Sequence, residues 1–177
     1  MAARELYYFA YGSNMHPARL RERTPSCRRI GVARLPGHVL RFHHLSVSDG
    51  SGKCNVVETG HPDDVVYGVV YGIPPAERRA LDAAENLGVG YRIRHMTVQM
   101  GEGQRRVFCY IAVDGTINDQ SRPYCWYRDI VLHGARQHAF PEAYLAAIAA
   151  EQVGRDPNPE RMAHHRGLLA IHEPLDD

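Results

Sequence analysis

Short β-prone runs separated by Gly, Pro and Asp residues fill the chain from residue 5 to about residue 113. This alternation is typical of a sheet made of many short strands. Seven strands are expected, at residues 6–10, 31–35, 39–43, 54–59, 65–73, 91–100 and 105–113. Two helices are expected between them, one over residues 16 to about 23 and one opened by Pro74-Pro75-Ala76-Glu77. Strands therefore dominate this part of the chain.

The C-terminal third has helical spacing. Apolar residues recur there at steps of three and four, at Trp126, Ile130 and Val131 and again at Tyr144, Leu145, Ile148 and Ala149. Gly134 and Pro141 are expected to mark a break between two helices. No repeat or linker divides the chain, so we expect one α+β domain over residues 1–177, with the helices from about 123 packed on the sheet. About the last ten residues are expected to be loosely ordered.

Composition limits the kind of partner. Lys and Arg number 21 against 20 Asp and Glu, and no long basic tract occurs, which favours a small-molecule partner over nucleic acid or membrane. The four cysteines have no Cys-x-x-Cys spacing, which fits reduced thiols in a cytosol. Residues 1–5 lack an apolar signal core and no run reaches membrane-spanning length, so a cytoplasmic location is expected.

One strand leads directly into a distinctive turn. Residues 6–10 precede Tyr11-Gly12-Ser13-Asn14-Met15, and His16-Pro17 then read as the start of a helix. Such a turn leaves backbone N–H groups without intrahelical partners at the positive end of a helix dipole. It can therefore bind a carboxylate or phosphate. The alternative is an ordinary helix entry capped by Asn14 or Ser13.

A second segment places a carboxylate at a helix end. Over residues 81–92 a helical pattern stops at Glu85, two glycines allow a loop, and Tyr91 opens the next strand. A carboxylate at the negative end of a helix is a candidate for proton exchange near neutral pH. The alternatives are a solvated Glu85 on the last helical turn and an inward-packing Tyr91.

Three segments together resemble a known family. Tyr11-Gly12-Ser13-Asn14-Met15 resembles the Tyr-Gly-Ser-Asn-Leu/Met signature of the γ-glutamylcyclotransferase-like (AIG2-like) family. Residues 81–91 resemble the segment with that family's catalytic glutamate, and the match falls on Glu85. Residues 123–135, which include Tyr127, followed by Phe140-Pro141, resemble its C-terminal segment. The three matches span nearly the whole chain in the family's order.

The resemblance implies a small mixed β-barrel with flanking helices and no cofactor. It also implies release of 5-oxoproline from a γ-glutamyl amide, by attack of the substrate's own α-amine on its γ-carbonyl. Glu85 would carry the proton from the attacking amine to the leaving nitrogen.

The resemblance implies substrate-binding residues as well. Backbone N–H groups of the turn would hold the α-carboxylate or polarise the γ-carbonyl, and three tyrosines would shape the pocket. The candidates are Gly12, Ser13, Asn14 and Met15 for the N–H groups and Tyr11, Tyr91 and Tyr127 for the pocket.

Several alternatives remain open from sequence. The leaving group could be an amino acid, or the same chemistry could remove a γ-glutamyl protecting group from a polyamine or secondary-metabolite amine. An insertion-like loop over residues 43–53 could form the acceptor side of the pocket. A non-catalytic binding module on the same fold is the alternative of another class. A homodimer is also possible on this sequence.

Other chemistries have weaker support. The eleven histidines include the pairs His43-His44 and His164-His165, but no pair has good ligand spacing, so no metal site is expected. Ser13 lacks the Gly-x-Ser-x-Gly surroundings of a serine nucleophile. Cys125 is expected to be a packed thiol rather than a nucleophile.

Overall fold

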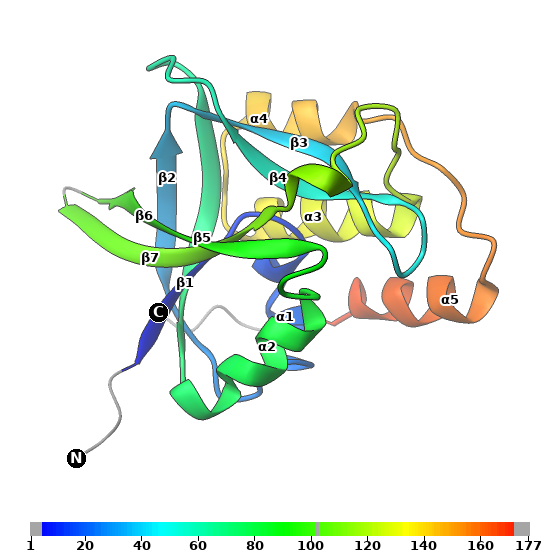
Figure 1. Cartoon of the computed structure of the whole chain (residues 1–177), viewed down its shortest axis with the longest axis horizontal. Coiled ribbons are helices and arrows are strands. Elements are labelled where there is room, and N and C mark those ends of the chain that lie inside the picture. Colours follow the sequence, from blue (N-terminus) through cyan, green and yellow to red (C-terminus); the bar gives the residue numbers. More distant parts are fainter. Residues whose placement is uncertain (1–4, 102, 172–177) are drawn as a thin grey trace.

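A closed five-stranded barrel organises the chain in the computed structural model, which describes residues 5–101 and 103–171 (Figure 1). Its strands are β1 (Leu6–Ala10), β2 (Arg28–Pro36), β5 (Val65–Ile73), β6 (Tyr91–Met100) and β7 (Gly103–Ala112). They follow the order β1-β5-β2-β6-β7 with antiparallel neighbours, and a parallel pairing of β1 with β7 closes the ring. The expected α+β fold with a small mixed barrel is confirmed.

A two-stranded hairpin lies beside the barrel, formed by β3 (His38–Leu45) and β4 (Gly52–Glu58). The expectation of a loop over residues 43–53 is wrong at both ends, because only residues 46–51 connect the strands. The strands extend further because distant backbone pairs with them. Asn118 N–H donates to His43 O at 2.8 Å, and Gly52 N–H donates to Arg122 O at 2.8 Å. These tertiary hydrogen bonds leave no periodic signal in the sequence.

Five α-helices and three short 3₁₀ turns are found in the described chain. The helices are α1 (Pro17–Arg21), α2 (Arg78–Ala84), α3 (Cys125–Gln137), α4 (Glu142–Ala149) and α5 (Pro159–Leu168). The 3₁₀ turns are η1 (Ser13–Met15), η2 (Pro75–Glu77) and η3 (Asp114–Thr116). Helix α5, which carries few apolar residues, has no counterpart among the predicted helices. The loose order expected for the chain end falls, from residue 172 on, outside the described residues.

Gly134 lies inside α3, so the predicted helix break at this position is wrong. A Cβ there would lie 3.1 Å from His16 N and 3.1 Å from Met15 Cβ. The glycine therefore lets α3 pack closely against η1. The break falls instead around Ala139, whose φ is +53°, and Pro141 precedes α4 as its N-cap residue.

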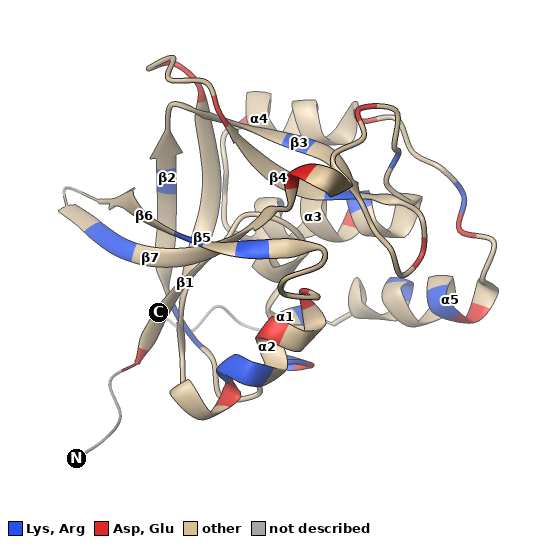
Figure 2. Ribbon diagram, viewed as in Figure 1, with Lys and Arg blue, Asp and Glu red and all other residues tan. Residues whose placement is uncertain are grey.

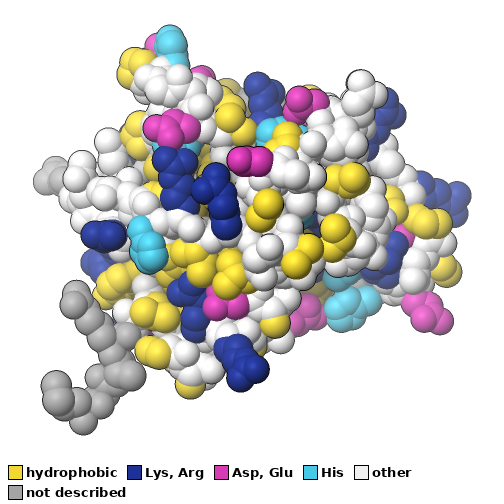
Figure 3. All heavy atoms as spheres, in the orientation of Figure 1, with side chains coloured by type: hydrophobic (Ala, Val, Ile, Leu, Met, Phe, Trp, Pro, Cys, Tyr) yellow, Lys and Arg dark blue, Asp and Glu magenta, His cyan; other side chains and the backbone are white. Residues whose placement is uncertain are grey.

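Side chains of the barrel and of α3 form the core. Among the largest fully buried side chains are Phe9, Val66, Val70, Ile73, Trp126 and Ile130. Charged residues of both signs are spread over helices and strands, as Figure 2 shows for α2 and α5. Figure 3 shows basic, acidic and apolar side chains interspersed on one face. No helix in the described chain combines the length and apolar content needed to cross a bilayer.

Three of the buried histidines are His16, His44 and His138. Burial lowers the pKa of each to about 4. His16 is fully buried, neither of its ring nitrogens has a hydrogen-bond partner in the described chain, and its ring stacks on that of His133. The folded protein therefore holds these imidazoles neutral at pH values where an unfolded chain protonates them.

We expect acid lability from these histidines. A free histidine titrates near about pH 6.5, so the unfolded state gains protons first as the pH falls from about 6.5 toward 4, and the folded state loses stability over that window. Each of these three histidines should destabilise the fold by about 1–2 kcal/mol at about pH 5. Urea midpoints measured at about pH 7.5 and 5 check this. The urea midpoint of His16→Phe should fall less between the two pH values than that of the unaltered protein. An equal fall in both proteins would contradict the assignment to His16.

Candidate active site

The turn after β1 keeps backbone donors available. Met15 N–H donates to Gly12 O at 3.0 Å and His16 N–H donates to Ser13 O at 3.2 Å, which forms η1. No side chain caps η1 or α1, so the alternative of a helix entry capped by Asn14 or Ser13 is not found. The N–H groups of Gly12, Ser13 and Asn14 have no hydrogen-bond acceptor among the described residues. Three donors can therefore bind a ligand oxygen.

Glu85 faces this turn from the C-cap of α2. Asn14 Nδ2 donates to Glu85 Oε1 at 2.7 Å and to the Tyr8 hydroxyl oxygen at 3.0 Å. Arg23 Nη1 lies 3.4 Å from the same Glu85 oxygen and also donates to Asn14 Oδ1. The Glu85 side chain is 15% exposed, so it is not a freely solvated residue. Residues 71 positions apart in sequence thus place a carboxylate beside an N–H-rich turn.

A small hollow of about 30 Å³ lies between the turn and Glu85, and we call it the inner hollow. Its lining is Tyr8, Tyr11, Gly12, Ser13, Asn14, Cys54, Glu85, Tyr91, Tyr110 and Tyr127. The Tyr91 hydroxyl donates to Cys54 O at 2.8 Å, and Cys54 N–H donates to the Tyr127 hydroxyl oxygen at 3.1 Å. Tyr11 donates to Tyr110 O. These hydroxyls are tied to backbone, so the tyrosines hold the shape of the hollow.

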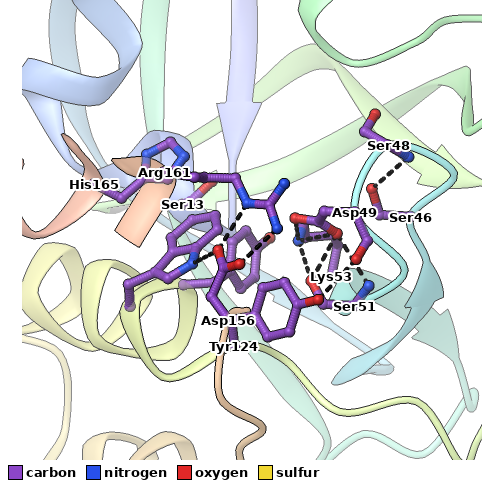
Figure 4. A network of polar contacts seen from close by, with 12 residues as sticks. Ser13, Ser46, Ser48, Asp49, Ser51, Lys53, Tyr124, Asp156, Arg161 and His165 are labelled. Carbon is purple, nitrogen blue, oxygen red and sulfur yellow. Dashed lines mark hydrogen bonds and ion pairs between the residues drawn. The ribbon is translucent and has the colours of Figure 1, made fainter. Parts of the chain in front are cut away.

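A larger cavity of about 270 Å³ adjoins the inner hollow, and we call it the outer cavity. Both are lined by Ser13, Glu85, Tyr91 and Tyr127. The outer cavity is also lined by Arg19, Arg23, His44, Ser46, Val47, Ser48, Asp49, Lys53, Ala84, Asn86, Trp126, Arg161 and His165. Figure 4 shows the polar contacts here, with Arg161 directed at Asp156 and Lys53 at Asp49. The β3–β4 hairpin thus lines the outer cavity.

The structure brings the predicted site residues together, with one exception. Met15 lines neither the inner hollow nor the outer cavity. Its side chain is fully buried in the core, its N–H donates to Gly12 O, and its carbonyl accepts from the Tyr71 hydroxyl at 2.9 Å. Met15 therefore offers no free donor to a ligand.

Sequence reasoning missed several lining residues. Arg19 and Arg23 are four positions apart just after the turn, which is a helical spacing that places both on one face. Lys53 is the sole lysine of the chain. Tyr8 belongs to the strand before the turn and looks like an ordinary strand aromatic. The first two signals were available from sequence, whereas the role of Tyr8 needed the fold.

Two other chemistries find little basis in the described chain. Burial raises the pKa of the Cys54 thiol in the inner hollow to about 12, so it stays protonated and is a poor nucleophile. Within residues 5–101 and 103–171 no group of three or more His, Cys, Asp or Glu side chains is arranged to hold a metal ion.

The barrel and its enclosed carboxylate define a small α+β protein with a carboxylate-lined hollow beside an N–H-rich turn. A family profile described as "Gamma-glutamyl cyclotransferase, AIG2-like" matches residues 8–129. The chain belongs to this family.

Individual relatives agree with this assignment. The human protein named gamma-glutamylcyclotransferase is 29% identical over 155 residues, which cover 81% of this chain and 77% of the human protein. The bovine protein of the same name is 30% identical over 142 residues. This alignment covers 77% of this chain and 73% of the bovine protein. Among solved structures, a gamma-glutamyl cyclotransferase gives a TM-score of 0.78 at 25% identity. The match covers 93% of this chain and 99% of the chain in that structure. The structure of an uncharacterised human protein gives a TM-score of 0.80 at 26% identity. The match covers 96% of this chain and 100% of the human chain.

Proposed function

We propose that this chain is a γ-glutamylcyclotransferase that releases 5-oxoproline and a free amine or amino acid from a γ-glutamyl amide. The observation that carries the proposal is the Glu85 carboxylate, hydrogen-bonded by Asn14 and facing the free N–H groups of the turn across the inner hollow. A binding module is not favoured, because an anionic ligand gains nothing from a second carboxylate in its site and the pair costs desolvation energy.

The reaction needs a folded substrate and one proton route. The α-amine of the γ-glutamyl group attacks its own γ-carbonyl carbon, and the bond from that carbon to the leaving nitrogen breaks. Glu85 takes a proton from the attacking amine and delivers it to the leaving nitrogen, so protons balance without a cofactor. The N–H groups of Gly12, Ser13 and Asn14 stabilise the oxyanion of the intermediate or the α-carboxylate.

Gly12 is suited to close approach of the substrate. A Cβ at this position would lie 3.0 Å from Cys54 Cβ and 3.5 Å from the Tyr127 hydroxyl oxygen, across the inner hollow. A side chain there would narrow a space of about 30 Å³. The missing Cβ thus keeps room beside the N–H donors for the γ-glutamyl group.

Asn14→Ala is expected to lower kcat about 10- to 100-fold with a smaller effect on KM. Asn14 Nδ2 holds Glu85 Oε1 at 2.7 Å, and losing this donor frees the carboxylate from its position over the substrate. Steady-state rates with γ-glutamyl-alanine, beside a thermal melt to verify folding, measure this. An unchanged kcat in a folded variant would remove Asn14 from the positioning of Glu85.

The proposed activity is tested with the purified protein and a panel of γ-glutamyl amino acids, glutathione and bulky γ-glutamyl amines. Release of 5-oxoproline from at least one member is expected, and the order of rates identifies the leaving group. No release from any member would contradict the cyclotransferase proposal.

Four related expectations are also proposals. We propose that residues 1–177 act as one domain, because α3 packs against η1 and contributes Tyr127 to the inner hollow. We propose a cytoplasmic location and a small-molecule partner. A homodimer is the assembly to test, by light scattering on the purified chain.

A further inference from the structure

Four cationic side chains line the outer cavity: Arg19, Arg23, Lys53 and Arg161. Three of them pair with carboxylates. Arg23 lies 3.4 Å from Glu85, Lys53 lies 2.8 Å from Asp49, and Arg161 lies 2.6 Å from Asp156. Their charges are compensated within the protein.

Arg19 differs from the other three. It is 6% exposed, and no carboxylate of the described chain forms an ion pair with it. Its Nε donates to Ser13 Oγ at 2.9 Å and its Nη1 donates to His165 Nδ1 at 3.0 Å, so both contacts are to neutral acceptors. Burial lowers the pKa of Arg19 to about 10, which leaves it charged at neutral pH. Burial lowers the pKa of His165 to about 3, so this ring adds no charge.

The carboxylates of Glu85 and Glu22 raise the pKa of Arg19 but do not contact it, and burial still outweighs them. Holding a buried guanidinium without a directly bound counter-ion is costly, and a bound anion would compensate this cost. Arg19 lines the outer cavity but not the inner hollow. Its contact Ser13 lines both, so the guanidinium stands where the two spaces meet. With the γ-glutamyl group in the inner hollow beside Glu85, the first atoms of the leaving amine lie on the side of the cavity that Arg19 lines.

We propose that Arg19 binds a carboxylate on the leaving amine and so selects γ-glutamyl amides of amino acids and peptides over γ-glutamyl amides of neutral or cationic amines. This inference rests on the proposed cyclotransferase function. The two cations with carboxylate partners, Lys53 and Arg161, also lie near aromatic rings, Lys53 over Trp126 and Arg161 over Tyr124. A γ-glutamyl polyamine would bring an ammonium group toward the positively charged Arg19. The repulsion between the two charges disfavours this substrate.

Two substrates that differ only by this carboxylate test the proposal. γ-Glutamyl-alanine and γ-glutamyl-ethylamide have the same leaving carbon skeleton apart from the carboxylate. We expect kcat/KM to be roughly 10- to 100-fold higher for γ-glutamyl-alanine, as for a charge-assisted hydrogen bond to a buried group. Equal kcat/KM values would overturn the proposal.

Variants then assign the preference to Arg19. Arg19→Met should bring the ratio of the two kcat/KM values close to one, and Arg19→Lys should keep part of the ratio because it keeps the charge. Arg155→Met removes the same charge from an exposed position outside the cavity lining and should keep the full ratio. An unchanged ratio in Arg19→Met, or an equal loss for both substrates as expected for a contact to the γ-glutamyl α-carboxylate, would overturn the proposal. If Arg19→Met does not fold, the substrate pair and Arg19→Lys still decide.

Binding gives a readout that does not depend on turnover. Trp126 is the sole tryptophan of the sequence and lines the outer cavity. The centre of its ring lies 5.8 Å from Cζ of the Arg19 guanidinium. Its fluorescence should report tighter binding of γ-glutamyl-alanine than of γ-glutamyl-ethylamide in Glu85→Gln, and equal affinities would contradict the role of Arg19. Absence of 5-oxoproline from both substrates with a retained binding preference would refute the proposed function and support the anion site.

Discussion

Glu85→Gln is expected to reduce 5-oxoproline release at least about 1,000-fold, the upper part of the range for loss of a general acid–base group. In the unaltered protein, Asn14 Nδ2 donates to Glu85 Oε1 at 2.7 Å. The amide of the variant has the same size, and its Oε1 can still accept this hydrogen bond. The variant can neither remove a proton from the attacking amine nor return one to the leaving nitrogen. Binding of the γ-glutamyl compound should therefore survive while turnover is lost.

The matched control is Glu142→Gln, the same chemical change at an exposed position in the first turn of α4. Its turnover should equal that of the unaltered protein. Initial rates of 5-oxoproline formation are measured for both variants beside their thermal melts. A folded Glu85→Gln protein with near-native rate would remove Glu85 from the mechanism.

Gly68→Ala is expected to lower the free energy of unfolding by about 2–3 kcal/mol, the upper part of the usual range for overpacking of a core. At Gly68 on β5, a Cβ would lie 2.4 Å from Phe9 Cε2 and 2.6 Å from Ala10 O. The second atom is backbone of β1, so relief requires the strand itself to move. Because β1 leads directly into the turn at residues 11–15, the same shift should also reduce activity.

Gly72→Ala makes the same substitution four residues further along β5 and serves as the control. The three atoms nearest to a Cβ there would be the carboxylate carbon and oxygens of Glu5, a side chain that can turn away. We expect a cost of less than about 1 kcal/mol, mainly from the exposed ion pair of Glu5 with Arg28. Urea denaturation of the two variants measures the difference. Equal unfolding free energies would contradict the close packing of β5 against β1.

Local patterns predicted the barrel well. The bounds expected for residues 6–10, 65–73 and 91–100 coincide with β1, β5 and β6, because turn-forming residues flank continuous β-prone runs there. The hairpin β3–β4 is longer than expected, since backbone from residues 118–122 pairs with its ends. Gly134 was misread because glycine breaks helices in general, whereas here it serves contact between α3 and η1.

The site was predictable where its chemistry is local. The turn at residues 11–15 and Glu85 each carry a signal in a few neighbouring residues, and the structure joins them through Asn14. The charge of the outer cavity was not predictable in this way. That Arg19 lacks a carboxylate partner while Lys53 has one depends on how α1, the hairpin and α5 come together, which no single segment of sequence specifies.

The most direct test of the central claim is product analysis of γ-glutamyl-alanine turnover in H₂¹⁸O. Attack by the substrate's own amine predicts 5-oxoproline without ¹⁸O, formed in equal amount to the alanine released. Glutamate carrying ¹⁸O would show attack by water and contradict intramolecular cyclisation, and absence of alanine release would contradict turnover of this substrate altogether.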